Sequence, residues 1–314
     1  MSDIYDLAIL GGGPAGITAA IYASRARLNT IWIDKNFAPG GQVTATYAVD
    51  NYPGMPGISG MDLGEAFGAH ARKLGLEPQR EKILSLENIS GEIKTIRTKK
   101  HEYQAKSLIL AFGAEHRKLD IPGEDDLSGL GVSYCATCDA NFFEDFEVYV
   151  VGGGDSAVEE AMYLTKFARK VTIIHRRDEL RAAKSIQEKA FKNPKLFFMW
   201  DSVVEELEGD DILQAMYVKN VKTGEVTKVE ADPEDGMFGL FGFIGTVPNT
   251  KIFEGVIDMD ERGYIKTDAD MHTNIPGVYA AGDVRVKSLR QVVTAAADGA
   301  IAAVQVERSM SDYF

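Results

Sequence analysis

The chain has 314 residues, a formal net charge of −13, and 45% hydrophobic and 26% charged residues. This length fits two domains of roughly 100–200 residues each, with the composition of an ordinary globular protein. The acidic balance disfavours nucleic acid and anionic lipid as partners unless the chain carries a local basic cluster. No stretch approaches the roughly 20 apolar residues of a membrane span, and the N-terminal segment lacks a secretory pattern, so we expect a cytoplasmic protein.

The chain opens with a predicted strand, glycine turn, helix and strand. The strands are predicted over Asp6–Leu10 and Thr30–Asp34, and the helix over Ala15–Arg27. The turn between them reads Gly11-x-Gly13-x-x-Gly16, in which the missing side chains let the backbone approach a pyrophosphate at the helix N-terminus. Asp34 stands 23 positions after Gly11 (34 − 11) and would bind ribose hydroxyls. This site therefore predicts an unphosphorylated ribose, as in FAD or NAD.

The only two cysteines are Cys135 and Cys138, in the run GVSYCATCDA. A zinc site would need two more ligands from five scattered histidines, which lack the usual spacing. Two incidental buried thiols are a simpler alternative, although the C-x-x-C spacing favours a reversible two-electron couple. Asp139 follows directly and is predicted either to exchange a proton with a sulfur or to cap a helix N-terminus.

The strand, turn, helix and strand pattern returns after the cysteines. We predict strands over Val148–Val151 and Val171–His175, with a helix over Ser156–Ala168. The turn reads Gly152-x-Gly154-x-x-Ala157, and position 175 (152 + 23) holds a histidine instead of an acid. Three nearby arginines suit a 2′-phosphate and predict NADP(H), although a solvated helix start would also explain them. These arginines are Arg176, Arg177 and Arg181.

The remaining segments indicate how the two patterns are organised. Shorter β-like pieces are expected over Lys82–Leu110 and Leu196–Phe243, a strand over Gly277–Asp283 and a final helix over Gln291–Ser309. The tail is too short for a third domain and most simply completes the first. We therefore predict an α/β protein in which residues 114–245 are inserted between residues 1–113 and 246–314, with a double hinge near residues 113–116 and 244–248.

With these residues in place, the chain resembles the low-molecular-weight thioredoxin reductases over essentially its whole length. The match includes GGGPAG at 11–16, PGGQ at 39–42, NYPG at 51–54, SYCATCD at 133–139, GGGDSA at 152–157, HRRDELRA at 175–182, IGTVPNT at 244–250 and the closing segment from residue 277. The resemblance implies two Rossmann-like domains of the disulfide reductase type, the first binding FAD and the inserted one binding NADPH. It also implies a homodimer that reduces thioredoxin.

Roles for individual residues follow from the same resemblance. Cys138 would face the flavin, Cys135 would attack thioredoxin and Asp139 would donate a proton. The resemblance also places Asp283, Gln42 and Asn51 at the FAD site. Asp283 could alternatively end a strand turn, and Gln42 or Asn51 could form hydrogen bonds to loops. The residues predicted for the FAD site are Gly11, Gly13, Pro14, Ala15, Gly16, Asp34, Lys35, Gly41, Gln42, Asn51, Asp283, Arg290 and Gln291, and those for the NADPH site are Gly152, Gly154, Asp155, Ser156, Ala157, Glu159, His175, Arg176, Arg177, Arg181 and Ile244. No metal site is expected.

The sequence departs from the family pattern at Phe112, Ala140 and Ala297. None of these removes a reacting group, and Phe142 with Phe143 could form an apolar landing patch for thioredoxin, or pack in the core. Other functions fit less well: a ferredoxin/flavodoxin–NADP reductase would not need the cysteine pair, and a ferredoxin-driven thioredoxin reductase would not need the arginines. An alkyl hydroperoxide reductase flavoprotein is expected to have a long N-terminal extension, and a non-catalytic redox sensor an output segment.

Overall fold

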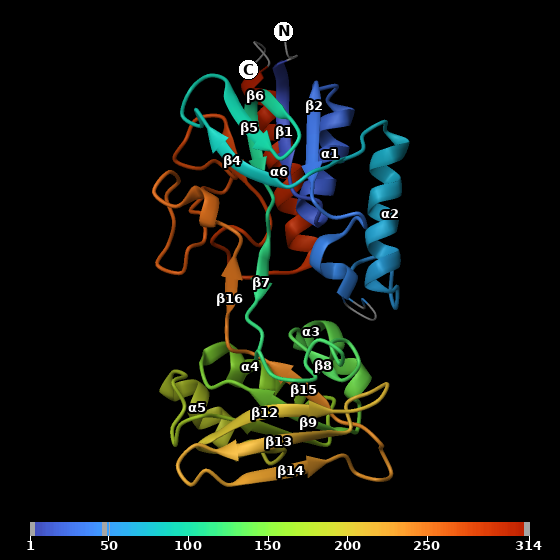
Figure 1. Cartoon of the computed structure of the whole chain (residues 1–314), viewed down its shortest axis with the longest axis vertical. Coiled ribbons are helices and arrows are strands. Elements are labelled where there is room, and N and C mark those ends of the chain that lie inside the picture. Colours follow the sequence, from blue (N-terminus) through green and yellow to red (C-terminus); the bar gives the residue numbers. More distant parts are fainter. Residues whose placement is uncertain (1–3, 46–48, 50, 311–314) are drawn as a thin grey trace. The chain divides into compact units, whose positions relative to one another are not determined.

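The computed structural model describes residues 4–45, 49 and 51–310. The chain divides into two compact units. Unit 1 comprises Met1–Thr44, Tyr52–Glu115 and Val247–Phe314, and unit 2 comprises Ala45–Asn51 and His116–Thr246. Each is built around a parallel sheet (Figure 1). In the part of the chain that the structure describes, no helix combines the length and apolarity needed to cross a membrane.

Unit 1 has a seven-stranded sheet in the order β3-β2-β1-β6-β5-β4, with β17 also paired to β6. β1, β2, β3, β6 and β17 run parallel, whereas β4 and β5 form an antiparallel edge. The strands are β1 (Ile4–Leu10), β2 (Thr30–Asp34), β3 (Gln79–Arg80), β4 (Ile83–Glu87), β5 (Lys94–Thr98), β6 (Glu102–Leu110) and β17 (Val278–Ala280). The helices are α1 (Pro14–Arg25), η1 (Gly41–Ala45), α2 (Gly60–Lys73), η3 (Lys251–Phe253) and α6 (Val292–Met310).

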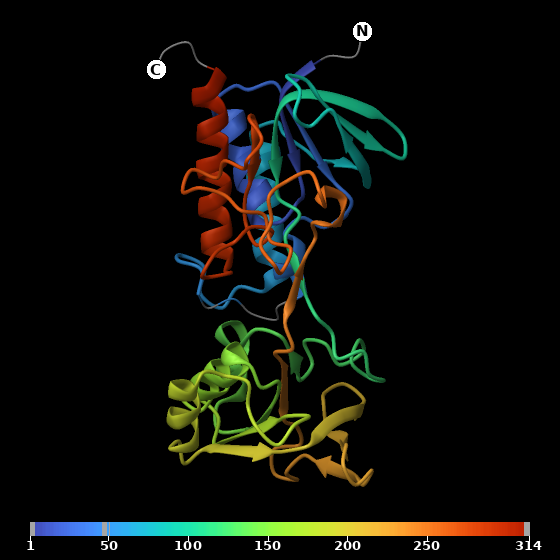
Figure 2. The same cartoon turned by 90° about the vertical axis from the view of Figure 1, so that its left-hand side faces the viewer.

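Small side chains allow α1 and α6 to pack closely against each other on one face of this sheet (Figure 2). Ala15, Ala19 and Ala23 of α1 are buried in the same cluster as Ala302 of α6. A Cβ atom on Gly299 would lie 2.0 Å from the carbonyl oxygen of Ala15, so no larger residue fits there without moving a helix. This contact joins the C-terminal helix to the helix of the first fingerprint.

Unit 2 repeats the parallel arrangement with a five-stranded sheet in the order β11-β10-β9-β15-β8 and adds an antiparallel meander, β12-β13-β14. Its strands are β8 (Val132–Ser133), β9 (Glu147–Val151), β10 (Lys170–Ile174), β11 (Leu196–Met199), β12 (Ser202–Glu208), β13 (Ala215–Asn220), β14 (Val226–Glu230) and β15 (Gly239–Gly242). Its helices are α3 (Ala136–Asp139), η2 (Ala140–Phe143), α4 (Asp155–Leu164) and α5 (Lys184–Phe191).

Two predicted helices end earlier than expected. α1 ends at Arg25 because the chain turns left-handed at Arg27, where φ is 58°. α4 ends at Leu164 instead of Ala168, and the hydroxyl of Thr165 donates to the carbonyl of Met162 at 2.7 Å. Such a local side-chain bond competes with continued helix.

The two segments that connect the units pair with each other. β7 (Ala114–His116) and β16 (Thr246–Pro248) form a two-stranded sheet. Gly113 and Gly245 flank it with φ values of 67° and 118°, a region that favours glycine. A Cβ atom at either glycine would meet nothing within 4 Å, so backbone conformation and not crowding is what selects glycine here.

Candidate functional site

The two glycine-rich turns occupy equivalent places in their sheets. In unit 1, Leu10 pairs with Ile33, and the next amide, Gly11 N, donates to the Ile33 carbonyl at 2.9 Å. In unit 2, Val151 pairs with Ile174, and Gly152 N donates to the Ile174 carbonyl at 3.2 Å. Each turn thus begins at the carboxyl end of a central strand, where the neighbouring strands lead to opposite sides, the place at which such sheets bind ligands.

In both units, a glycine of the turn lies against the residue that ends the second strand. A Cβ atom on Gly12 would lie 2.2 Å from a carboxylate oxygen of Asp34, and one on Gly153 would lie 2.3 Å from the ring of His175. Asp34 and His175 are therefore structural counterparts, as the count of 23 positions predicts.

The helices that follow the turns begin without a side-chain cap. Gly13 is the N-cap of α1 and Gly154 is the N-cap of α4, and neither position has a side-chain hydrogen bond. The first amides of each helix are left for an anion, which the helix dipole favours at this end. Pro14 and Ala15 start α1, whereas Ser156 and Glu159 lie on exposed positions of α4 and Ala157 is buried.

Among the residues of unit 1 that the structure describes, three polar atoms are buried without a hydrogen-bond partner: Asp34 Oδ2, Asp283 Oδ1 and Arg290 Nε. Burial raises the pKa of the Asp34 carboxyl, and it raises that of Asp283 as well. The Arg290 guanidinium lies 4.0 Å from the ring centroid of Tyr264. An unpartnered buried oxygen is costly, so these two carboxylates are acceptors suited to hydroxyl donors of a ligand.

The turn that carries Asp283 is held by a residue that the sequence did not single out. Asp298 of α6 is buried and accepts from Gly282 N at 3.0 Å, Arg285 Nε at 3.0 Å and Lys287 Nζ at 2.8 Å. β17 ends at Ala280, and the role of Asp283 toward a ligand stays a prediction. A carboxylate in the middle of an alanine-rich helix was the signal available in the sequence, because a charge is seldom buried unless it is paired.

Gln42 and Asn51 both bond to backbone, the alternative that the sequence left open. Gln42 Nε2 donates to the Ala114 carbonyl at 2.6 Å, and Asn51 Nδ2 to the Thr137 carbonyl at 3.4 Å. Lys35 is exposed after β2, Gly41 begins η1, and Gln291 directly precedes α6. Their roles toward a ligand stay predictions.

The three arginines predicted to bind a 2′-phosphate, Arg176, Arg177 and Arg181, lie on a loop and not on a helix, because α5 begins only at Lys184. All three side chains are exposed. The loop is held by backbone bonds from Arg181 N and Ala182 N to the Gly153 carbonyl, at 2.7 and 3.1 Å. Asp155 Oδ1 accepts from Ala183 N at 2.7 Å, which gives this predicted site residue a bracing role.

Gln187 also braces the arginine loop and was missed by the sequence analysis. Its buried amide donates to the carbonyls of Leu180 and Ala182, at 3.1 and 2.7 Å. A polar residue on the buried face of α5, beside Ala190, was the signal that could have identified it.

His175 lies in an electropositive environment. Burial lowers its pKa first, and the charges of Arg181, Arg177 and Arg176 lower it further. Its Nε2 atom is buried without a partner. A neutral imidazole surrounded by three guanidinium groups favours an anion, in contrast with the carboxylate at the same place in unit 1.

The two cysteines form a disulfide bond, with their Cα atoms 5.3 Å apart. Joined sulfurs cannot act as free thiolate ligands, and among residues 4–45, 49 and 51–310 no group of three or more His, Cys, Asp or Glu is placed to hold a metal ion. The pair lies at the start of α3, which Asp139 ends.

Asp139 is the N-cap residue of η2, but its side chain makes no cap hydrogen bond there. Its Oδ2 atom accepts from the hydroxyl of Ser133 at 2.5 Å, whereas Oδ1 is buried without a partner. Burial raises its pKa from 3.8 to about 6. A carboxyl with a raised pKa, directly after a cysteine of the disulfide, is suited to proton exchange.

Of the two phenylalanines considered for an apolar patch, one packs in the core and one is exposed. Phe143 is 4% exposed and packs edge-to-face on Phe241, whereas Phe142 is 37% exposed. Phe143 is therefore a core residue and does not contribute to a landing surface.

Of the departures from the family pattern, Phe112 packs on Phe253, Ala140 is buried and Ala297 is exposed. Ile244, predicted for the NADPH site, is exposed next to Gly245.

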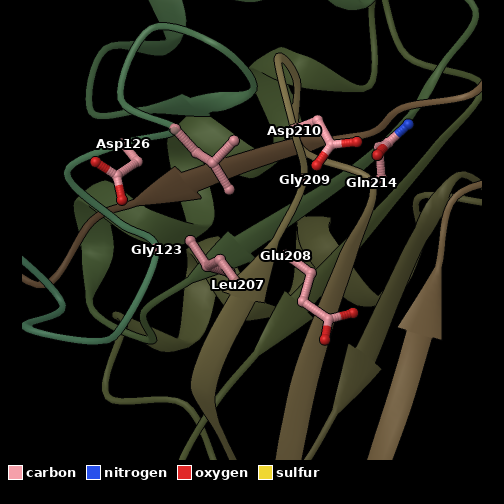
Figure 3. Close-up of a pocket in the computed structure, with 8 residues that line it drawn as sticks. Gly123, Asp126, Leu207, Glu208, Gly209, Asp210 and Gln214 are labelled. Atoms are coloured by element: carbon pink, nitrogen blue, oxygen red, sulfur yellow. The ribbon is translucent and has the colours of Figure 1, made fainter.

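A separate pocket of about 470 Å³ lies in unit 2 (Figure 3). Its lining includes the carboxylates of Asp126, Glu208 and Asp210 and no cationic side chain. This acidic lining would repel a nucleotide phosphate.

Comparisons with known proteins agree with this geometry. The family described as pyridine nucleotide-disulphide oxidoreductase matches residues 5–299. Thioredoxin reductases of Peptoclostridium acidaminophilum and Peptoclostridium litorale are 58% and 54% identical, each over 100% of this chain and 99% of the relative. The crystal structure of thioredoxin reductase from Streptococcus pyogenes is 46% identical, covers 98% of both chains and superposes with a TM-score of 0.91. The chain therefore belongs to the pyridine nucleotide-disulphide oxidoreductases and, within them, to the low-molecular-weight thioredoxin reductases.

Proposed function

We propose that the chain binds FAD in unit 1 and NADPH in unit 2, and that its Cys135–Cys138 couple reduces the disulfide of a thioredoxin. The observation that carries the proposal is the opposite charge at two equivalent positions. A carboxylate, Asp34, suits the hydroxyls of an unphosphorylated ribose, whereas His175 with its arginines suits a 2′-phosphate. The redox-active disulfide belongs to the same unit as the phosphate-binding arginines.

The residues of unit 1 fit FAD. Asp34 Oδ2 and Asp283 Oδ1 are buried acceptors without a hydrogen-bond donor, with Arg80 Nη1 3.7 Å from Asp34 Oδ2, and the uncapped start of α1 suits a pyrophosphate. Asp34 would hold the adenosine ribose, and Asp283, positioned by Asp298, would hold the flavin side. When bound, FAD would supply two-electron chemistry that matches both a nicotinamide and a disulfide.

The residues of unit 2 fit the phosphorylated dinucleotide. The uncapped start of α4 would receive the pyrophosphate, and Arg176, Arg177 and Arg181 would bind the 2′-phosphate. His175 Nε2, buried and unpartnered, lies where a ribose or phosphate oxygen would approach. The bonds from Asp155 and Gln187 hold the loop ready before the ligand arrives.

In the second half of the reaction, the reduced cysteine pair exchanges with thioredoxin. One cysteine sulfur of the pair, which we assign to Cys135, attacks and breaks the thioredoxin disulfide, forming a mixed disulfide. Cys138 then attacks Cys135, which restores the Cys135–Cys138 bond and leaves two thiols on thioredoxin. Asp139 holds one of the two protons that move between the pairs.

Both the disulfide and the NADPH fingerprint belong to unit 2, so each would have to reach the flavin in turn. We therefore propose that unit 2 rotates between half-reactions about the paired connections, near Gly113 and Gly245. We also propose a homodimer, as the resemblance implies. Light scattering of the purified holoenzyme will test that state.

The central experiment is a spectrum of the purified protein followed by anaerobic titration. We expect flavin absorbance that NADPH bleaches, and turnover that requires thioredoxin. Cys138→Ser should retain NADPH-dependent bleaching and lose thioredoxin reduction. A colourless protein, or a Cys138→Ser variant that still reduces thioredoxin, would contradict the proposed function.

A further inference from the structure

Ser133 lies two residues before the first cysteine and makes two bonds with one hydroxyl. The hydroxyl donates to Asp139 Oδ2 at 2.5 Å, and it accepts from the backbone amide of Cys135 at 3.1 Å. The residue is only 6% exposed. One side chain therefore joins the backbone of a reacting cysteine to the carboxyl that follows the other cysteine.

The surrounding backbone gives Ser133 a fixed position. It belongs to β8, a two-residue strand at the edge of the parallel sheet, and its register partner is Phe241 of the neighbouring strand β15. On the far side of the loop, the Cys135 carbonyl accepts from Cys138 N at 3.3 Å and Asp139 N at 3.1 Å. The hydroxyl thus lies between this strand and the short helix α3, which begins directly after Cys135 and contains Cys138.

Two effects shift the pKa of the Asp139 carboxyl, in opposite directions. Burial raises its pKa, to about 6, and the Ser133 hydrogen bond opposes that shift because it stabilises the carboxylate. The elements packed against α3 are η2, which has no charged residue, and α4. The charged residues of α4 are Asp155, Glu159 and Glu160, and none of them is a cause of the shift.

We propose that Ser133 is a positioning residue for the dithiol chemistry: its hydroxyl orients the Asp139 carboxyl and links it to the Cys135 amide. The inference rests on the proposed role of Asp139 in proton exchange. A serine hydroxyl has one donor and two acceptor positions. It can therefore donate to Asp139 when that group is a carboxylate and accept from it when it is protonated. In both states it can still accept the hydrogen bond from the Cys135 amide. The carboxyl would then hold one orientation in both protonation states.

The orientation of the Asp139 carboxyl matters in the step that reduces thioredoxin. Reduction of thioredoxin moves two electrons and two protons from the cysteine pair to the thioredoxin sulfurs. The Cys135–Cys138 bond forms as the thioredoxin disulfide breaks, and Asp139 carries one proton in transit. A carboxyl free to rotate would present its proton in the right direction only part of the time.

The test compares Ser133→Ala, Ser133→Thr and Asp139→Asn in the FAD-loaded enzyme, with Ser202→Ala as a matched control. Ser202 is a buried serine of the same unit whose hydroxyl donates to the Trp200 carbonyl. The first readout is the pH dependence of single-turnover thioredoxin reduction by prereduced enzyme. The second is an infrared titration of the Asp139 carboxyl in the oxidised protein, assigned by its absence from Asp139→Asn.

We expect Asp139→Asn to slow the transfer roughly 100-fold or more and to remove one inflection of the pH profile. Ser133→Ala should move that inflection, and the infrared titration, to higher pH by about one unit, the size expected for losing a hydrogen bond to a charged group. Ser133→Thr, which keeps the hydroxyl, should restore both values. Ser202→Ala should change neither.

The outcomes separate the two proposals. An unchanged rate and profile in Asp139→Asn would remove Asp139 from the mechanism and contradict the proposed function at that residue. An effect of Asp139→Asn combined with unshifted titrations in Ser133→Ala would overturn the role of Ser133 alone. If Ser133→Ala loses its fold, the wild-type infrared band decides: a carboxylate frequency typical of a strong hydrogen bond supports the inference, and that of a free carboxylate overturns it.

Discussion

Units 1 and 2 share the same strand and glycine-turn backbone, but the side chains beside the turn carry opposite charge. In each, a central parallel strand ends in a glycine turn, and the second residue of that turn lies against the residue that closes the neighbouring strand. That closing residue is the buried carboxylate Asp34 in unit 1 and the buried imidazole His175, beside three arginines, in unit 2. On the proposed function, the fold supplies the place for a dinucleotide, and one side chain with its loop would select which dinucleotide binds.

The largest effect on catalysis should come from removing the three arginines that are proposed to bind the 2′-phosphate in unit 2. Replacing Arg176, Arg177 and Arg181 together by Ala should lower kcat/KM for NADPH on the order of 100-fold, because each charge-assisted bond to a phosphate contributes about 1.5–3 kcal/mol and such terms are not fully additive. The value for NADH should change little. Steady-state kinetics with both nucleotides measures this.

Arg97→Ala is a suitable control for the arginine variant, since Arg97 is an exposed arginine of unit 1 paired with Glu87 and Glu102. It should leave both nucleotides unaffected. An equal decrease in kcat/KM for NADPH and for NADH in the triple variant would show that the arginines do not bind the 2′-phosphate.

The next largest effect should come from the counterpart in unit 1. Asp34→Asn should weaken FAD binding to the apoprotein by about 10- to 100-fold, the cost of losing hydrogen bonds to a charged acceptor. Because burial raises the pKa of Asp34, the same change removes a buried charge, and the apoprotein should not lose thermal stability at neutral pH. Flavin fluorescence quenching measures the affinity, and unchanged FAD binding would remove Asp34 from the site.

A matched pair of glycine substitutions would test whether the two sites act separately. Gly12→Ala places a Cβ against Asp34, and Gly153→Ala places one against His175, at nearly equal distances of 2.2 and 2.3 Å. Overpacking of this kind costs about 1–3 kcal/mol, so each should weaken one ligand by about tenfold. Gly12→Ala should reduce FAD content and Gly153→Ala should raise the KM for NADPH. A loss of both ligands in either variant would contradict independent sites.

The smallest effect concerns the protonation of His175. Its pKa is lowered in the free protein by burial and by the arginines, so the folded state disfavours its charged form and loses stability as the pH falls through the ordinary histidine range. A bound 2′-phosphate would offset the arginine charges and raise the pKa of His175, so NADP⁺ should bind more tightly as the pH falls. NMR titration of the histidine ring should show an upward shift of about half to one unit with NADP⁺. A similar shift with NAD⁺ would exclude the 2′-phosphate as its cause.

Part of this site could be predicted from the sequence because its signals are local. The glycine spacing, the acid or histidine 23 positions later and the C-x-x-C pair each depend on a short stretch whose backbone geometry is nearly fixed by residue type. The ends of α1 and α4 were placed less well, because side-chain bonds and left-handed turns that end a helix compete closely with continued helix.

Other residues became visible only in the folded chain. Ser133, Gln187 and Asp298 act through bonds to groups at different positions along the chain, and each is an ordinary polar residue in its own neighbourhood. The pair Phe142 and Phe143 is a similar case, since adjacent aromatic residues are alike in the sequence and only the packing against Phe241 assigns one to the core.

The sequence by itself determined the family, the two fingerprints and the charge that each presents, because these depend on residue type and spacing along one strand, turn and helix. Tertiary structure alone decided which polar atoms are buried without partners, and which side chains hold the reacting groups in place. Burial depends on elements that meet only after folding, and burial is the main cause of the raised pKa of Asp139.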